Sequence, residues 1–218
     1  MKNYAVFDNF LDNTVMKGKH SRQLESAMRK HFLKFPYIRD EEVENHQFTP
    51  FVYTFYDLVG KSGWIPFQSE FVRAYITQQG DEFKDLYKRK REAVEARLMR
   101  CHPSYARDLH FAMKCRESGL FDDVIYNPDM DVKQGIDLLI LKDCKFYGVH
   151  LFVDTNRGHG WRNKKNNRHS DPNKFVTEFD FTVYKQDGFK CGEYFLFGQD
   201  QVRKLYEHIV RLEESSYV

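Results

Sequence analysis

The sequence predicts an α/β protein in which a mixed central sheet of about four to five strands is flanked by helices and preceded by a mainly helical portion. Three observations predict this class. Apolar stripes at helical spacing dominate residues 1–101, and short apolar segments separated by turns dominate residues 102–218. The apolar fraction is 41% and includes 20 Phe and 13 Tyr, which is enough to build a core and excludes a disordered chain.

The N-terminal region, residues 1–101, is expected to consist mainly of helices. A helix is predicted over residues 21–35, because apolar residues recur there at helical spacing and Pro36 follows. Residues 49–59 are almost continuously apolar or aromatic, and another helix is predicted over residues 69–78.

Two further helices are expected to meet near Pro103. The first begins after Gly80 and ends near Cys101, with an apolar stripe on one side and basic residues elsewhere around its axis. The second opens at Pro103, because proline suits the first turn of a helix, and runs to Glu117. Gly119 provides a stop.

The second half then changes to strand-like segments. Short apolar runs bounded by turn residues predict neighbouring strands, with Asp143, Cys144 and Lys145 as a hairpin connection between two of them. A final helix is expected over residues 200–214. The predicted strands cover residues 124–126, 135–141, 148–154, 175–184 and 194–197.

Charge and cysteine usage indicate which partner and which cellular compartment to expect. The net charge is only +2, yet basic residues gather at Lys88 to Arg91 and at Arg157 to Arg168, which fits a polyanionic partner as well as plain solvated faces. The four cysteines show no C-x-x-C pair, so a reducing compartment is expected. No signal peptide or bilayer-spanning segment is visible, which favours the cytoplasm and no membrane partner.

The order helix, three strands, helix, strand over residues 103–184 resembles the core of the PD-(D/E)XK nuclease superfamily. The resemblance implies a restriction-endonuclease-like core over residues 102–218. In that family an acid on the second strand and an acid-x-lysine on the third converge at one edge of the sheet. Asp137, within Gly-Ile-Asp-Leu-Leu-Ile, matches the first acid.

The third strand departs from the family pattern. His150 stands at the position of the second acid, and Phe152 stands at the position of the lysine. Period-two spacing puts His150, Phe152 and Asp154 on one face, so Asp154 is a second candidate carboxylate. By resemblance to relatives with a relocated lysine or an additional helix acid, three further catalytic candidates are Lys164, Lys165 and Glu117.

The resemblance implies Mg²⁺ or Mn²⁺ as the cofactor and DNA as the partner. The metal ligands would be Asp137, His150 and Asp154, with oxygen ligands suiting magnesium and imidazole tolerated. The phosphates of nucleic acid would meet the basic residues Lys88, Arg89, Lys90, Arg91, Arg157, Arg162 and Arg168.

Three functions follow as alternatives. The first is a metal-dependent DNA endonuclease of the restriction, transposon or mobile-element kind, and the second is a catalytically inactive nucleic-acid-binding or regulatory protein on the same scaffold. The third is a phage or plasmid protein-interaction module. Structural roles stay open beside them: Asp137 as a turn cap or a partner of Arg157, His150 as a core histidine, and Asp154 as a strand end. A homodimer is also left open.

Overall fold

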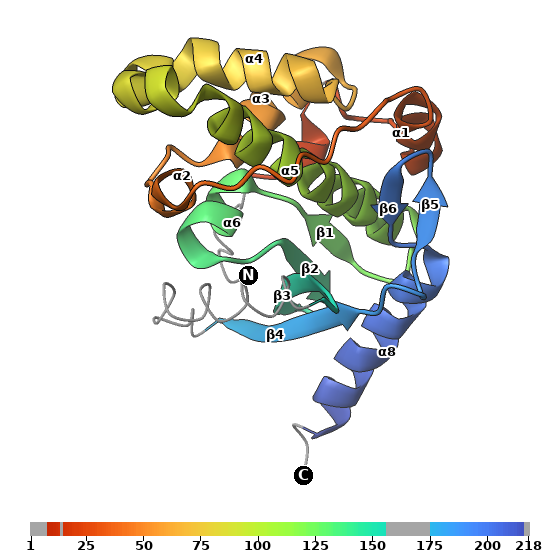
Figure 1. The fold of residues 1–218 in the computed structure, drawn as a ribbon. Coiled ribbons are helices and arrows are strands. Elements are labelled where there is room, and N and C mark those ends of the chain that lie inside the picture. The colour runs from red at the N-terminus through yellow and green to blue at the C-terminus, as the bar shows by residue number, and fades with distance from the viewer. Residues whose placement is uncertain (1–7, 14, 156–174, 216–218) are drawn as a thin grey trace. The chain divides into compact units, whose positions relative to one another are not determined.

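The computed structural model shows a mixed α/β protein (Figure 1) and describes residues 8–13, 15–155 and 175–215. The chain divides into two compact units. The first contains Met1–Ser21, Asp108–Phe189 and Leu196–Val218, and the second contains Arg22–Arg107 and Lys190–Phe195. Both units are therefore assembled from segments that are distant in the sequence.

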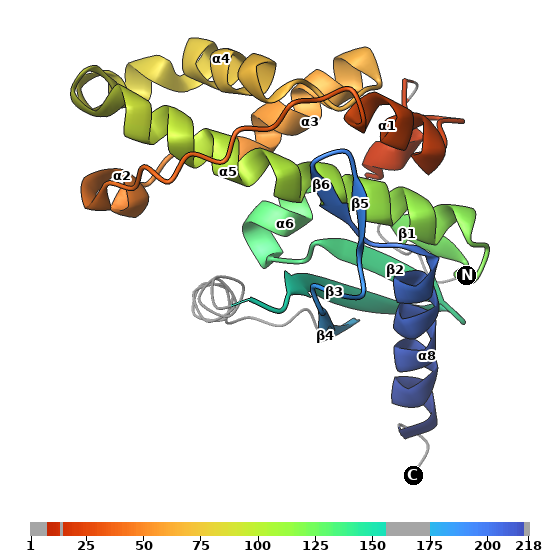
Figure 2. The ribbon, with the colours of Figure 1, turned by 45° about the vertical axis from the view of Figure 1, so that its right-hand side comes forward.

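A four-stranded mixed sheet forms the centre of the first unit, as Figure 2 shows. The strands lie in the order β1-β2-β3-β4; β1, β2 and β3 are antiparallel neighbours, and β4 is parallel to β3. The mixed sheet is confirmed. Its strands are β1 (Asp123–Ile125), β2 (Leu138–Lys142), β3 (Lys145–Val153) and β4 (Val176–Val183).

The predicted hairpin between β2 and β3 is also confirmed. Lys142 pairs with Lys145, which leaves a two-residue turn. Asp143 and Cys144 both have positive φ, 48° and 62°. A turn with two left-handed residues matches the right-handed twist of the strands on either side of it.

Helix α8 (Gln199–Ser215) packs on one face of the sheet. Its buried side chains include Val202, Leu205 and Ile209. The Tyr147 hydroxyl on β3 donates to Glu213 Oε1 at 2.8 Å, and the Phe179 ring on β4 lies 4.6 Å from the His208 ring. Tyr147 and Phe179 therefore identify the covered face.

A short helix, α6 (Pro128–Gln134), connects β1 to β2 and was not predicted. Asn127 caps it by accepting from the backbone of Asp129 and Met130, Pro128 occupies its first turn, and Gly135 ends it at φ 74°. A capping residue followed by proline, with glycine at the end, is a helix signal. It was missed because the helix is too short to show an apolar stripe. The helix matters because it delivers Gly135 and Asp137 to the start of β2.

The second unit is largely helical. Its elements include α1 (Ser21–Met28), α2 (Glu41–Asn45), α3 (Phe51–Ser62), α4 (Gln68–Gln79), the 3₁₀ turn η2 (Gly80–Phe83) and the first part of α5 (Lys84–Glu117), a helix that supplies residues to both units. A small two-stranded sheet is formed by β5 (Phe189–Cys191) and β6 (Tyr194–Leu196). A 3₁₀ turn, η1 (Phe10–Asp12), belongs to the first unit.

The predicted helix over residues 21–35 was too long. It ends at Met28, and His31 N–H closes a tighter turn onto the Met28 carbonyl at 3.0 Å. Beyond it the backbone is held by side chains instead: the Lys34 N–H donates to Gln68 Oε1 at 2.8 Å. Tertiary hydrogen bonds override helix propensity in this segment.

The prediction that Pro103 separates two helices was wrong, because α5 continues through it. Proline has no N–H, so the carbonyl four residues earlier, that of Met99, loses its helical donor. The buried Gln68 side chain replaces that donor, with Nε2 2.8 Å from the Met99 oxygen. The non-helical backbone inside α5 lies instead at Lys90, with φ −131° and ψ 32°.

No helix among the described residues is long and apolar enough to cross a membrane.

Candidate functional site

Asp137 lies immediately before β2, where its carboxylate contacts the backbone of β3. Oδ2 accepts a hydrogen bond from the Leu151 N–H at 2.7 Å, and the Asp137 N–H donates to the Val149 carbonyl at 3.1 Å. Leu138 pairs with Val149 in the antiparallel register. One residue further along this register, Asp137 lies beside His150. A half-buried carboxylate is thus stabilised by a backbone donor at the junction of two strands.

The His150 ring is oriented by a backbone carbonyl. Its Nδ1 lies 2.7 Å from the Gly135 oxygen, and because a carbonyl only accepts, Nδ1 carries the proton. The other nitrogen, Nε2, lies 3.2 Å from Glu178 Oε2. A carbonyl that accepts from one ring nitrogen fixes the orientation of the other, here toward Glu178, and the same arrangement is found around metal-binding imidazoles.

Glu178 on β4 is the member of the site that sequence reasoning missed. The parallel register pairs Glu178 with Gly148 and His150 with Asp180. A Cβ on Gly148 would come within 3.0 Å of Glu178 Cγ, so the glycine lets the Glu178 stem lie across β3 toward His150. The available signal was the acidic alternation of Glu178 and Asp180 along β4.

The structure does not bring the third-strand alternatives to the same place. Asp154 follows β3, and its N–H donates to the Val183 carbonyl at 2.9 Å. Four residues of strand separate it from His150, about 13 Å along the chain. Phe152, at the lysine position of the resembled family, lies between them and pairs with Thr182.

Glu117 serves a different contact at the end of α5. Its carboxylate accepts from the Ser21 hydroxyl at 2.6 Å and from the Ser21 backbone N–H, and His20 Nδ1 lies 3.8 Å away. The chain after Glu117 enters the sheet where Asp123 pairs with Leu141, the end of β2 opposite to Asp137. The structure therefore groups Glu117 with Ser21.

The basic run on α5 is engaged in ion pairs within the second unit. Arg89 contacts Glu42 at 2.6 Å, Lys90 contacts Asp40 at 2.7 Å, and Arg91 contacts Glu95 at 2.8 Å, while Lys88 is exposed. The hydrogen bond from Lys90 lowers the pKa of the Asp40 carboxyl. Phosphates would have to compete with these carboxylates for three of the four cations.

The remaining predicted residues, Arg157, Arg162, Lys164, Lys165 and Arg168, lie outside the described residues.

Residues 8–13, 15–155 and 175–215 offer few ligands to a divalent cation. Within these described ranges, no group of three or more His, Cys, Asp or Glu side chains is close enough to hold a metal ion. His150 and Glu178 stand as a pair, with Asp137 anchored at the adjoining strand. Magnesium commonly takes one or two protein ligands together with waters and substrate phosphate oxygens, so this donor set suits a cation completed by substrate.

Fold and geometry together define a mixed α/β protein with a carboxylate and imidazole site across three adjacent strands. Comparison of the chain with protein-family models, with curated protein sequences and with solved structures gives no match.

Proposed function

We propose that the protein is a metal-dependent DNA endonuclease that hydrolyses phosphodiester bonds at Asp137, His150 and Glu178. The observation that carries the proposal is the orientation of His150: its Nδ1 is fixed on the Gly135 carbonyl, and its Nε2 faces the Glu178 carboxylate at 3.2 Å. Mn²⁺ or Mg²⁺ would be bound between these two groups, and the imidazole favours Mn²⁺.

Strand order supports a restriction-endonuclease-like assignment of the sheet. Three antiparallel strands are followed in the sequence by a fourth, which lies parallel beside the third. Each of three neighbouring strands supplies one group, from Asp137 at β2 through His150 on β3 to Glu178 on β4. A fold alone does not deliver an activity, so the assignment depends on these three side chains.

The roles of the side chains follow from their contacts. A bound divalent cation neutralises the phosphate and activates a water. Glu178 and His150 are suited to bind that cation, because an anionic oxygen and an oriented nitrogen stand at 3.2 Å. Asp137, held by the Leu151 N–H, would orient the water.

A second function is favoured by Phe152. An aromatic ring at the lysine position of the resembled family supplies no positive charge for the transition state, and it suits a protein that binds nucleic acid without cleaving it. Such a protein would show salt-sensitive DNA binding that does not require a cation.

The first function is tested by cleavage of supercoiled plasmid DNA with Mn²⁺ or Mg²⁺. Asp137→Asn is the variant of choice, because the asparagine oxygen still accepts from the Leu151 N–H and should leave the fold intact. We expect a loss of cleavage of about 100-fold or more, comparable to the removal of one stabilising group from an active site. Asp81→Asn, the same change at an exposed position in η2, is the matched control.

Cleavage that survives in a folded Asp137→Asn variant would exclude this site. Absence of cleavage by the unchanged protein with either cation, together with salt-sensitive DNA binding, would establish the second function instead.

A further inference from the structure

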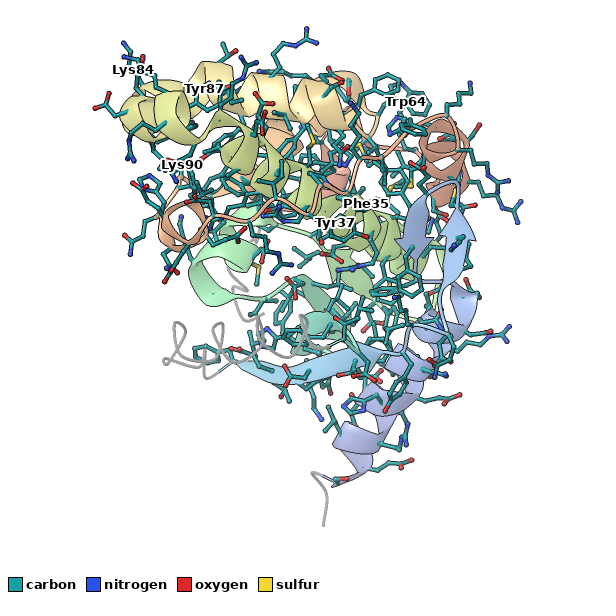
Figure 3. The ribbon with its side chains drawn as sticks, in the orientation of Figure 1. Phe35, Tyr37, Trp64, Lys84, Tyr87 and Lys90 are labelled. Atoms are coloured by element: carbon teal, nitrogen blue, oxygen red, sulfur yellow. The ribbon has the colours of Figure 1, made fainter. Side chains whose placement is uncertain are left out.

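An extended segment of the second unit, residues 29–39, carries an unusual combination of side chains; we call it the strap. Its sequence is Arg-Lys-His-Phe-Leu-Lys-Phe-Pro-Tyr-Ile-Arg, which contains cations and aromatic rings and no carboxylate. Phe35 and Tyr37 are labelled on it in Figure 3. Its exposed aromatic residues are Phe32, Phe35 and Tyr37, and its exposed cations are Arg29, Lys30, Lys34 and Arg39.

The degree of exposure sets the strap apart from ordinary surface. Tyr37 is 98% exposed, Phe32 78% and Phe35 52%, although burial of such rings would stabilise the fold. Trp64 and Phe67, at the connection of α3 and α4, are 41% and 53% exposed. Phe67 lies against the strap, because its ring is 4.5 Å from that of His31. Large apolar side chains exposed to this degree on neighbouring residues favour an interaction site.

The side chains of Gln68 and Arg100 hold the backbone of the strap by hydrogen bonds. Lys34 exchanges two hydrogen bonds with the buried Gln68 side chain, at 2.8 and 2.9 Å. The Arg100 guanidinium, only 7% exposed, donates to the Ile38 carbonyl at 2.6 Å and to the Pro36 carbonyl at 3.4 Å, and it also pairs with Glu44. The aromatic side chains are therefore presented outward from an ordered chain, which reduces the entropy lost on binding.

We propose that the strap is a docking surface for single-stranded nucleic acid. Bases stack on the faces of Phe32, Phe35 and Tyr37, and Lys30, Lys34 and Arg39 meet the phosphates. Aromatic platforms interleaved with cations are the general means of binding single strands without sequence preference. Charge complementarity favours a polyanion as this partner, because the strap carries cations and no carboxylate of its own.

This inference goes beyond the proposed function and does not depend on it, since the strap contains none of the groups of the candidate site. Single-strand binding is therefore expected whether or not the protein cleaves DNA.

The test is binding of a fluorescent 20-nucleotide oligothymidine, followed by anisotropy. The double variant Phe35→Ala/Tyr37→Ala removes two exposed rings whose loss leaves the core intact, and we expect it to bind at least about 25-fold more weakly, about five-fold for each stacked base. The matched control is Phe175→Ala/Tyr184→Ala, in which rings 87% and 51% exposed are removed from the first unit. Its binding should stay within about two-fold of the unchanged protein.

The salt dependence tests the cations separately. Three phosphate contacts correspond to a slope of about −2 in a plot of log affinity against log salt. The triple variant Lys30→Gln/Lys34→Gln/Arg39→Gln should remove that contribution. The proposal would be overturned by an equal loss of oligonucleotide affinity in Phe35→Ala/Tyr37→Ala and in its control Phe175→Ala/Tyr184→Ala. Absence of oligonucleotide binding at low salt would also overturn it. Binding of vesicles that contain phosphatidylserine without binding of the oligonucleotide would also overturn it and would assign the strap to a lipid surface.

Discussion

His102 is a buried titratable side chain that should make the stability of the protein depend on pH. Its Nε2 donates to the Pro66 carbonyl at 2.8 Å, and its Nδ1 has no hydrogen-bond partner among the described residues. Protonation would thus place an unpaired N–H in the core, and burial lowers the pKa of His102 to about 4. The folded protein keeps this ring neutral where the unfolded chain protonates it.

The sign of the effect follows from that difference. The stabilisation of the fold by neutral His102 is complete above pH 6.5, the ordinary pKa of histidine. It is lost as the pH falls from 6.5 to about 4. Between pH 7 and pH 5 the free energy of unfolding should fall by about 2 kcal/mol because of this residue. Urea denaturation at both pH values measures it, and His102→Gln should lack that part of the decrease. Equal decreases in both proteins would show that another group is responsible.

Gly148 is a residue where one methyl group should disturb the candidate site. A Cβ there would lie 3.0 Å from both Glu178 Cγ and Val176 Cγ1, and 3.1 Å from Ile136 Cδ1. Gly148→Ala should cost about 1–3 kcal/mol of stability and displace Glu178 from His150, which would weaken Mn²⁺ binding.

Gly80→Ala is the control for that variant. The added Cβ would meet only Ile76 Cγ2 at 3.6 Å, an ordinary contact, and φ at Gly80 is −60°. Chemical denaturation and Mn²⁺ titration should show a neutral or slightly stabilised protein with unchanged cation binding. Gly148→Ala with undisturbed Mn²⁺ binding would argue that Glu178 is not a ligand.

At the scale of the elements, the continuity of α5 through Pro103 depends on Gln68. Gln68→Leu removes the donor to the Met99 carbonyl and both hydrogen bonds to Lys34, and it should cost about 3 kcal/mol or more. Pro103→Ala restores a backbone N–H for Met99, so part of the loss should be recovered in the double variant. The coupling is measured by a double-mutant cycle in urea. Strictly additive effects would contradict the replacement of the helical donor by Gln68.

The elements differ in how far local sequence determines them. The strands of the four-stranded sheet and α8 could be predicted because apolar runs, turn residues and a helical stripe agree within each segment. The passage of α5 through Pro103 could not, because the donor to the Met99 carbonyl is the side chain of Gln68, a residue distant in the sequence.

Across the whole molecule, only those residues of the candidate site whose pairing is set locally could be predicted from the sequence. Asp137 and His150 could be brought together in advance, because a two-residue hairpin fixes the register of β2 against β3. Glu178 could not, because the register of β4 against β3 is set across a crossover. The composition of the two units, each built from distant segments, was likewise not encoded in any single stretch.

The central claim is that a divalent cation is held at the junction of β2, β3 and β4. Anomalous diffraction from crystals grown with Mn²⁺ and recorded at the manganese edge tests it most directly. We expect a peak within ligand distance of His150 Nε2 and Glu178 Oε2. Manganese bound elsewhere, with the His150 and Glu178 pair still closed on itself, would contradict it.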